Sequence, residues 1–340
     1  MKQHHYLILG ALLALGSACG DDDGGATDTG AEMAAGDDMA TGEDMAVSGV
    51  NDSCPSFFAE SSMAMAPGPQ NQMGNCCWRA SNEERPEAPE LRIAGLAINA
   101  PNSLAIAANI ALPDLFDNET FNWLIEITGA DADGEVSIRT GFGRRQDGGT
   151  FTFDTGEFPP GVQVGTITGD VVTSGIFDSV VSVPVVDVVD PNLVLLTLPL
   201  RDLVVNRAPL DANRNCIGTR DEGTNRYALS DDDPSAGSLS AFITVEDSFD
   251  ATLELTSPVT LSVSLCNVTR GALDGGTNDC REIPQSDWMV MPDSLCGADG
   301  CSVNTEGMTD ACDPTTNAAD GGCNAWQITA TFAAQGVEIN

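Results

Sequence analysis

The sequence predicts an all-β fold: an antiparallel β-sandwich or barrel-like domain that ends in a disulfide-stapled, loop-rich region. Three observations support this prediction. Short segments alternate apolar and polar residues, runs rich in β-branched residues lie between them, and clusters of Gly, Asp and Pro separate them. Many short strands with few helices are typical of sandwiches and barrels.

The alternating segments have the period of two that a half-buried strand requires. The clearest are FNWLIEIT and WQITATF, and shorter examples are TFTF and TLSVSLC. The continuous apolar runs VVSVPVVDVV and LVLLTLPL indicate more deeply buried strands. One short helix is expected at SLAIAANIAL, capped by Asn102 or Ser103 and stopped by Pro113.

The first 20 residues have the pattern of an export signal. Residues 6–15 form an apolar run that is too short to span a bilayer as a helix, and three small residues lead to Cys19. This arrangement resembles the lipobox of bacterial lipoproteins, although a glycine stands three residues before Cys19, where that motif usually has leucine. The resemblance covers residues 1–20 only. It implies cleavage before Cys19 and attachment of lipid, including palmitate-like acyl chains, to that cysteine.

The same resemblance implies a cellular location. Because Gly20, and not aspartate, follows the cysteine, the sorting rule of that family favours the outer membrane or cell surface. An ordinary secretory signal cut at the same bond is the alternative, and it would give a secreted or periplasmic protein.

The chain divides into three parts. Residues 1–18 are the predicted signal peptide, 19–53 the lipidated cysteine and a disordered acidic tether, and 54–340 the disulfide-rich β domain. The tether holds ten acidic residues and no basic one, so it cannot bury enough apolar surface to fold. Two smaller β domains that meet near 206–240 are the alternative, because NRAPLDANRN and SDDDPSAG resemble loops.

Charge and composition exclude several functions. Lys2, His4 and His5 all lie in the signal peptide, so the remaining chain has neither lysine nor histidine, and its formal net charge is −38 instead of −37. Catalytic triads, Cys-His pairs and histidine-ligated zinc cannot form without histidine. Carboxylate chemistry, such as glycoside hydrolysis, remains open. A surface this negative repels nucleic acid and anionic lipid headgroups.

The chain has eleven cysteines, and lipidation of Cys19 would leave an even number for five disulfides in an oxidising compartment. They fall into an N-terminal group of three, a middle pair and a C-terminal group of five. We therefore expect one bridge between the N-terminal and C-terminal groups, and Cys216–Cys266 as the middle pair. A zinc cluster of the last four cysteines is the alternative. The disulfide candidates are Cys54, Cys76, Cys77, Cys216, Cys266, Cys280, Cys296, Cys301, Cys312 and Cys323.

The stretch DANRNCIGTRDE is the candidate metal site. Asp211, Asn213, Asn215 and Glu222 occupy positions one, three, five and twelve of an EF-hand calcium loop. However, Cys216 stands where such a loop needs glycine, and neither flank looks helical. A loop rich in Asx turns and pinned by a Cys216 disulfide is the preferred interpretation, with a weak calcium site as the alternative. No other cofactor is expected.

These features predict a surface-anchored envelope lipoprotein with a non-enzymatic binding, adhesion or structural role. Its partners would be the membrane, through the lipid, and an unidentified protein or glycan, but not nucleic acid. The alternatives are a carboxylate-dependent glycan hydrolase and a weak calcium-dependent binding module. Trp123 and Trp326 lie in phase with apolar strand faces and are expected in the core, which leaves Trp78 and Trp288 as candidates for a glycan-stacking surface.

Overall fold

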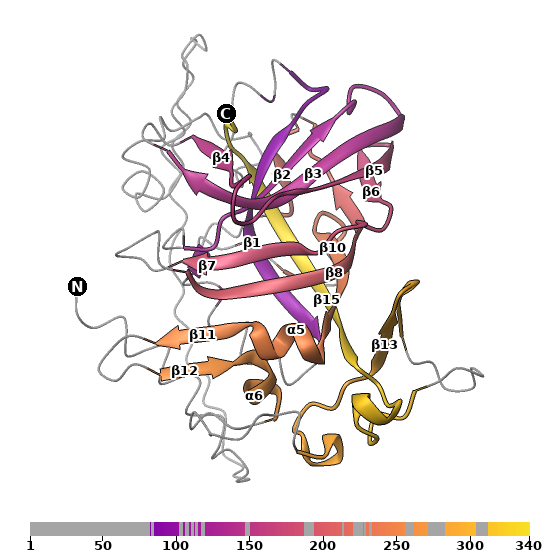
Figure 1. Cartoon of the computed structure of the whole chain (residues 1–340). Helices are drawn as coiled ribbons and strands as arrows, with labels where there is room; N and C mark the ends of the chain where they lie inside the picture. Colours follow the sequence, from indigo (N-terminus) through magenta and orange to yellow (C-terminus); the bar gives the residue numbers. More distant parts are fainter. Residues whose placement is uncertain are drawn as a thin grey trace, which may run out of the picture.

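The structure, a computed structural model, describes much of the chain beyond residue 81 (Figure 1). The described residues are 82, 85–101, 105, 109, 112, 115–116, 120–146, 150–186, 194–212, 214–219, 227, 229–230, 233–255, 261–270, 283–303 and 312–340. The predicted signal peptide, the tether and the N-terminal cysteines lie outside them.

Eight of the described strands join edge to edge into a closed antiparallel barrel. The ring closes because the first of them pairs with the second on one side and with the last on the other. The all-β prediction is therefore confirmed in its barrel form. In order around the barrel, the strands are β1 (Glu90–Ala100), β2 (Trp123–Thr128), β3 (Gly134–Arg145), β5 (Gly161–Thr168), β6 (Val171–Ser174), β8 (Val194–Pro209), β10 (Gly237–Thr244) and β15 (Ala325–Gly336).

Apolar side chains fill the interior of the barrel, as expected for a ring of eight strands. On β2, Trp123, Ile125 and Ile127 point into this core, and the preceding Phe121 packs with them. On β15, the alternating residues from Trp326 to Phe332 do the same. The one-sided faces predicted for FNWLIEIT and WQITATF are thus confirmed, and so is the core position of both tryptophans.

A tight turn joins β5 to β6. Its two central residues, Gly169 and Asp170, have φ of 54° and 67°. This left-handed backbone suits the twist of a two-residue hairpin, and glycine and aspartate are among the residues that tolerate it. The N–H of Gly169 donates to the Asp133 carboxylate at 2.9 Å, which ties this turn to the turn between β2 and β3.

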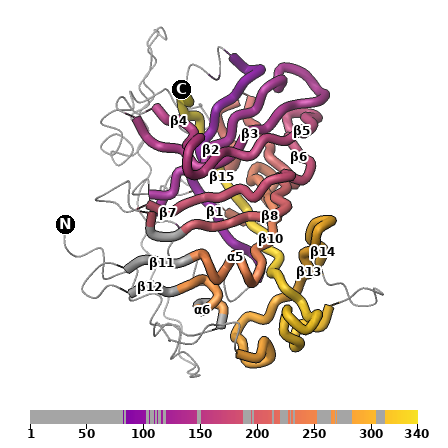
Figure 2. Tube along the Cα trace, viewed as in Figure 1, coloured from indigo at the N-terminus to yellow at the C-terminus, as the bar shows by residue number. Residues whose placement is uncertain are grey.

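Further strands extend the barrel sheet or lie beside it. β4 pairs with β3, β7 with β8 and β9 with β15, while the β13–β14 hairpin joins the start of β15 and β11–β12 form a separate small sheet. In Figure 2 the C-terminus lies beside β4, at the opposite end of the barrel from this hairpin. The bounds are β4 (Phe151–Phe153), β7 (Val181–Val186), β9 (Cys216–Ile217), β11 (Thr252–Leu255), β12 (Leu261–Ser264), β13 (Ser294–Gly297) and β14 (Gly300–Val303).

The helices within the described residues are short. They include α5 (Val245–Asp250), α6 (Leu265–Arg270) and the 3₁₀ turns η3 (Gln285–Asp287) and η4 (Ala318–Asp320). In this part of the chain, no helix has the length and apolarity needed to cross a lipid bilayer. In the segment predicted as a helix before Pro113, the described residues Ala105, Asn109 and Leu112 are helical.

Two segments differ from their predicted form. Strand β8 continues to Pro209, so the first residues of NRAPLDANRN belong to a strand, because they pair with β10 and β6. The segment TLSVSLC ends in α6 from Leu265 onward. Strands from both sides of residues 206–240 belong to the same sheet.

Candidate functional site

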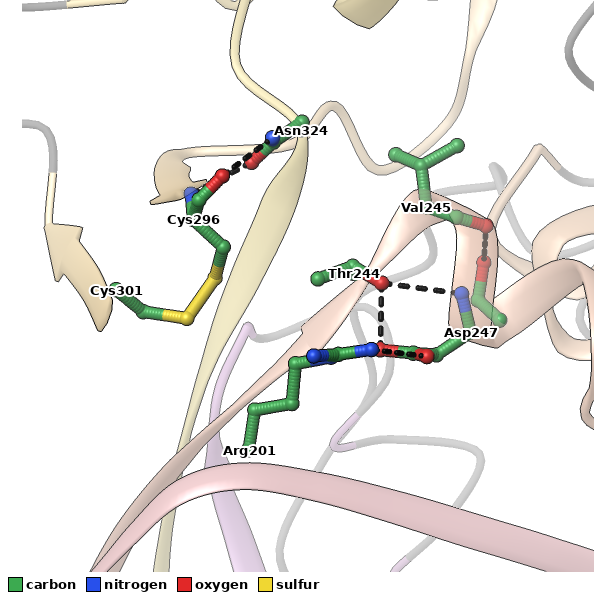
Figure 3. A network of polar contacts seen from close by, with 8 residues as sticks. Arg201, Thr244, Val245, Asp247, Cys296, Cys301 and Asn324 are labelled. Carbon is green, nitrogen blue, oxygen red and sulfur yellow. Dashed lines mark hydrogen bonds and ion pairs between the residues drawn. A yellow bond between two sulfur atoms is a disulfide. The ribbon is translucent and has the colours of Figure 1, made fainter. Parts of the chain in front are cut away.

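A network of polar side chains lies where β8, β10 and the start of α5 meet, near the β13–β14 hairpin (Figure 3). Arg201 of β8 donates from Nε and from Nη2 to the two carboxylate oxygens of Asp247, the second bond at 2.8 Å. Strand β10 ends at Thr244, whose hydroxyl accepts the Asp247 N–H at 3.0 Å and donates to the Asp247 carboxylate at 2.6 Å. This cap and the two-pronged ion pair attach the first turn of α5 to the barrel.

Both charges of this pair are stabilised in their ionised forms. Burial opposes ionisation of Asp247, but the hydrogen bonds from Arg201 and Thr244 outweigh it, so the pKa of Asp247 lies below its usual value. The hydrogen bond to Asp247 raises the pKa of Arg201. A catalytic acid or base needs a pKa near the working pH, so this pair has the electrostatics of a structural contact.

Replacing Asp247 with asparagine is expected to lower the free energy of unfolding by about 1 kcal/mol at neutral pH, a modest value because Arg201 is partly exposed to solvent. Since the native pKa is lowered, the contribution of Asp247 is present above its unfolded pKa near 3.8 and is lost as the pH falls through the native pKa. Urea denaturation of both proteins from neutral to acidic pH measures it. The prediction would be contradicted if the difference in the free energy of unfolding between the two proteins did not decrease at acidic pH.

Asp202, the next residue of β8, holds the β13–β14 hairpin against the barrel. Its backbone is left-handed, with φ of 47°, and its Oδ2 accepts the Cys301 N–H at 2.6 Å. Cys296 lies on the other strand of the hairpin, β13. The side chain of Asn324, the residue before β15, accepts the Cys296 N–H at 2.7 Å and donates to the Cys296 carbonyl at 2.8 Å. Polar side chains next to or within the barrel thus hold both strands of the hairpin.

Three exposed apolar side chains lie on one side of the barrel, and we call them the apolar wall: Val162, Val164 and Ile176. They are 61%, 53% and 54% exposed. The first two point outward from β5. The third follows β6, in a segment whose backbone hydrogen bonds join Gly175 to Val164 and Phe177 to Leu203 of β8. These bonds place Ile176 between β5 and β8.

Strand alternation alone would assign the apolar wall to the interior, because Val162 and Val164 are two residues apart and apolar residues at this spacing usually form the buried face of a strand. The structure turns the other face inward: Gly161 lies against Phe177 and Val181, and Ile167 belongs to the core. Ile167 is out of phase with both valines, and this is the sequence signal that could have identified them as exposed.

A second set of exposed apolar side chains lies in the hairpin and in the residues that precede it in the sequence. Met289 and Met291 precede it and Leu295 and Val303 lie in it, with exposed fractions from 36% to 62%. Trp288, a candidate for a glycan-stacking surface, is buried and stacks on Trp326 at 5.9 Å between ring centroids. That candidate is therefore wrong for Trp288, while Trp78 lies outside the described residues.

Three other carboxyl groups among the described residues have shifted pKa values, and each of them accepts hydrogen bonds from neighbouring groups. Burial raises the pKa of Glu90, whose oxygens accept from Arg85 at 3.0 Å and from the Ile339 N–H at 2.7 Å. For Asp154, the bonds from Arg144 and from backbone N–H groups outweigh burial, and its pKa is lowered. Asp313 has a lowered pKa because the side chain and backbone of Thr315, with other groups of its own turn, donate to it.

Of the four candidate calcium residues, Asp211 and Asn215 lie within the described part of the chain. Asp211 uses its carboxylate to accept the N–H groups of Asn215, at 2.6 Å, and of Cys216, at 2.8 Å. This is the Asx-turn loop of the preferred interpretation. Asn213 and Glu222 lie outside the described residues. Among those described, no group of three or more His, Cys, Asp or Glu side chains could hold a metal ion.

The C-terminal cysteines form local disulfides, Cys296–Cys301 and Cys312–Cys323. A zinc cluster of these four cysteines is therefore wrong, because their sulfurs are already bonded in pairs. Cys216 and Cys266 are disulfide-bonded too, but not to each other. The predicted Cys216–Cys266 pair is therefore wrong. Lipidation of Cys19, and the pairing of Cys54, Cys76, Cys77 and Cys280, lie outside the described residues.

Comparisons with protein-family models, with curated proteins and with solved structures gave no match to this chain.

Proposed function

We propose that this chain is an exported envelope lipoprotein, held to a membrane by lipid on Cys19, whose β-barrel has a non-enzymatic role, the binding of a partner protein. The observation that carries the binding role is the apolar wall, Val162, Val164 and Ile176, each more than half exposed on one side of the barrel. Exposed apolar side chains that lie together on a folded surface are typical of interaction sites.

The state of the cysteines supports export. All six cysteines within the described residues are disulfide-bonded. Disulfides persist in secreted and envelope proteins and are rare in the reducing cytosol. The signal-like residues 1–20 and the acidic spacer after Cys19 agree with the same address. The spacer would hold the barrel away from the membrane surface.

Charge narrows the class of partner. The chain beyond the signal peptide has a formal net charge of −38, which repels nucleic acid and anionic membranes. Arg139, which pairs with Val162 across β3 and β5, already binds Glu126 and lies over the Phe153 ring. The partner that fits is therefore a protein of neutral or positive net charge with an apolar contact surface.

Photo-crosslinking in intact cells tests the binding role. A benzoylphenylalanine residue in place of Val164 is expected to give a crosslinked protein, identifiable by mass spectrometry. The same residue in place of Thr168 is the matched control, because Thr168 is exposed on the same face of the same strand. The adduct should disappear when Val162 and Ile176 are both changed to threonine. Equal crosslinking at both positions, or none at Val164, would overturn the proposed wall.

Metabolic labelling with an alkyne-tagged palmitate tests the anchor separately. The wild-type chain should carry the label and sediment with membranes, while Cys19→Ser should lose the label and enter the soluble fraction. Cys54→Ser is the control, since that residue is expected to form a disulfide. An unlabelled wild-type protein would reject the lipid anchor without bearing on the wall.

A further inference from the structure

The Cys296–Cys301 disulfide differs from its neighbours in accessibility. It joins opposite residues of β13 and β14, directly before the Gly297↔Gly300 pair at the hairpin turn. Both of its cysteines are half-buried, and the turn residues next to them are exposed. The other four described cysteines are buried; they are Cys216, Cys266, Cys312 and Cys323. Within the described residues, this is therefore the disulfide that an attacking thiol reaches most readily in the folded protein.

Within the described residues, the two strands of the hairpin that carries this disulfide are short and pair with the barrel at one point. Each strand has four residues, and a single residue pair, Ser294↔Ala325, joins the hairpin to β15. Leu295 and Val303 are more than a third exposed, and neither belongs to the barrel core. Isolated two-stranded hairpins are marginally stable. The disulfide and the polar contacts from Asp202 and Asn324 therefore hold the hairpin in place.

We propose that Cys296–Cys301 is a thiol–disulfide exchange site, and that its substrate is the dithiol of an extracytoplasmic protein. One thiolate of that dithiol attacks a sulfur of the pair, forms a mixed disulfide and releases the other cysteine as a thiolate. The second thiol of the partner then attacks the mixed disulfide. Both cysteines become thiols, and the partner leaves with its two thiols joined as a disulfide, so two electrons and two protons pass to this chain.

Charge favours a protein dithiol over small acidic thiols such as glutathione. Asp202 accepts from the backbone N–H of Cys301 at 2.6 Å, and its carboxylate adds to the strongly negative charge of the whole chain. An anionic thiol is repelled by this charge, whereas an uncharged or basic dithiol surface is not. After exchange, residues 294–303 lose their covalent closure, while the barrel keeps its ring of paired strands. We therefore expect reduction of the disulfide to change the conformation of the hairpin and to leave the barrel unchanged.

The test uses the full mature chain under native conditions. It is incubated with dithiothreitol, with glutathione or with a purified thioredoxin-class dithiol, trapped with iodoacetamide, and mapped by mass spectrometry. With either dithiol, Cys296 and Cys301 are expected to be alkylated roughly tenfold or more faster than Cys312 and Cys323. Glutathione should be slower than the dithiols. Equal rates at all disulfides, or reaction only in denaturant, would overturn the proposal.

Paired variants test the structural consequence. Changing Cys296 and Cys301 to serine should raise amide hydrogen exchange in residues 294–303 and leave the barrel strands unchanged. The Cys312→Ser, Cys323→Ser double variant is the matched control, and it should not alter exchange in the hairpin. If hydrogen exchange in the hairpin stayed the same without the disulfide, the disulfide would not hold the hairpin in place, and the expected structural consequence would be overturned. If the hairpin variant fails to fold, the alkylation of the wild-type chain still decides whether the site reacts.

Discussion

Replacing Phe332 with alanine is expected to lower the free energy of unfolding by about 3–5 kcal/mol. Phe332 is fully buried in β15, opposite Leu96 of β1 and Gly237 of β10. Its ring covers the glycine so closely that a Cβ built on Gly237 would lie 2.4 Å from the ring Cζ. Truncation therefore leaves a cavity where β15 meets both of its neighbours in the barrel.

Urea denaturation followed by circular dichroism measures this loss. Thr329→Ala is the matched control on the same strand, because Thr329 lies on the opposite face and is partly exposed; its effect should stay within about 0.5 kcal/mol. Gly237→Ala places a methyl group against the Phe332 ring from the neighbouring strand, so this substitution should also destabilise the barrel. Combining Gly237→Ala with Phe332→Leu should destabilise less than the sum of the two single changes. Strict additivity would show that the ring does not cover the glycine as described.

Local periodicity predicted the strands but could not predict how they close into a barrel. The alternation from Trp326 to Phe332 shows which face of β15 is buried, and the structure confirms it. It does not show that β15 pairs with β1, more than 200 residues earlier in the chain. Register and neighbours depend on contacts between distant segments, and these have no signal in a single sequence. The sequence alone therefore does not distinguish a β-sandwich from a β-barrel.

The same limit applies to the candidate site. Val162 and Val164 suggest a buried face when they are judged by apolar character alone. Packing of Gly161 and Gly165 on the inner face reverses that assignment. The polar network of Arg201, Thr244 and Asp247 has only one local signal, the cap residue three positions before Asp247. Its arginine comes from another strand, so the pair could not be predicted.

Replacing Cys216 with serine is expected to lower the free energy of unfolding by about 5 kcal/mol. Cys216 is buried in β9 and disulfide-bonded. We expect its partner to be Cys76 or Cys77, so that the bond closes a loop of roughly 140 residues; in the chain-entropy model a loop of that length gives about this value. The expectation replaces the Cys216–Cys266 pair and leaves Cys280 for Cys266, so it also replaces the predicted bridge between the N-terminal and C-terminal cysteine groups.

The geometry around Asn82 supports this partner. The Asn82 side chain donates to the carbonyls of Glu90, at 2.9 Å, and of Arg214, at 3.2 Å. These bonds hold residue 82 beside the segment that leads into Cys216. Cys77 is five residues from Asn82 in the sequence, and five residues of chain span at most about 17 Å. We therefore expect Cys77, or its neighbour Cys76, to be the cysteine that bonds to Cys216.

Peptide mapping of the non-reduced protein identifies the partner, and urea denaturation measures the loss. The Cys312→Ser, Cys323→Ser double variant is the control for loop length: it opens a loop of 11 residues in sequence separation, for which the same model gives about 3 kcal/mol. The longer loop should therefore have the larger effect. A Cys216 peptide linked to Cys280 would contradict the assignment. A smaller loss for Cys216→Ser than for the control would contradict the entropic argument, because only a bridge between distant segments restricts so much of the unfolded chain.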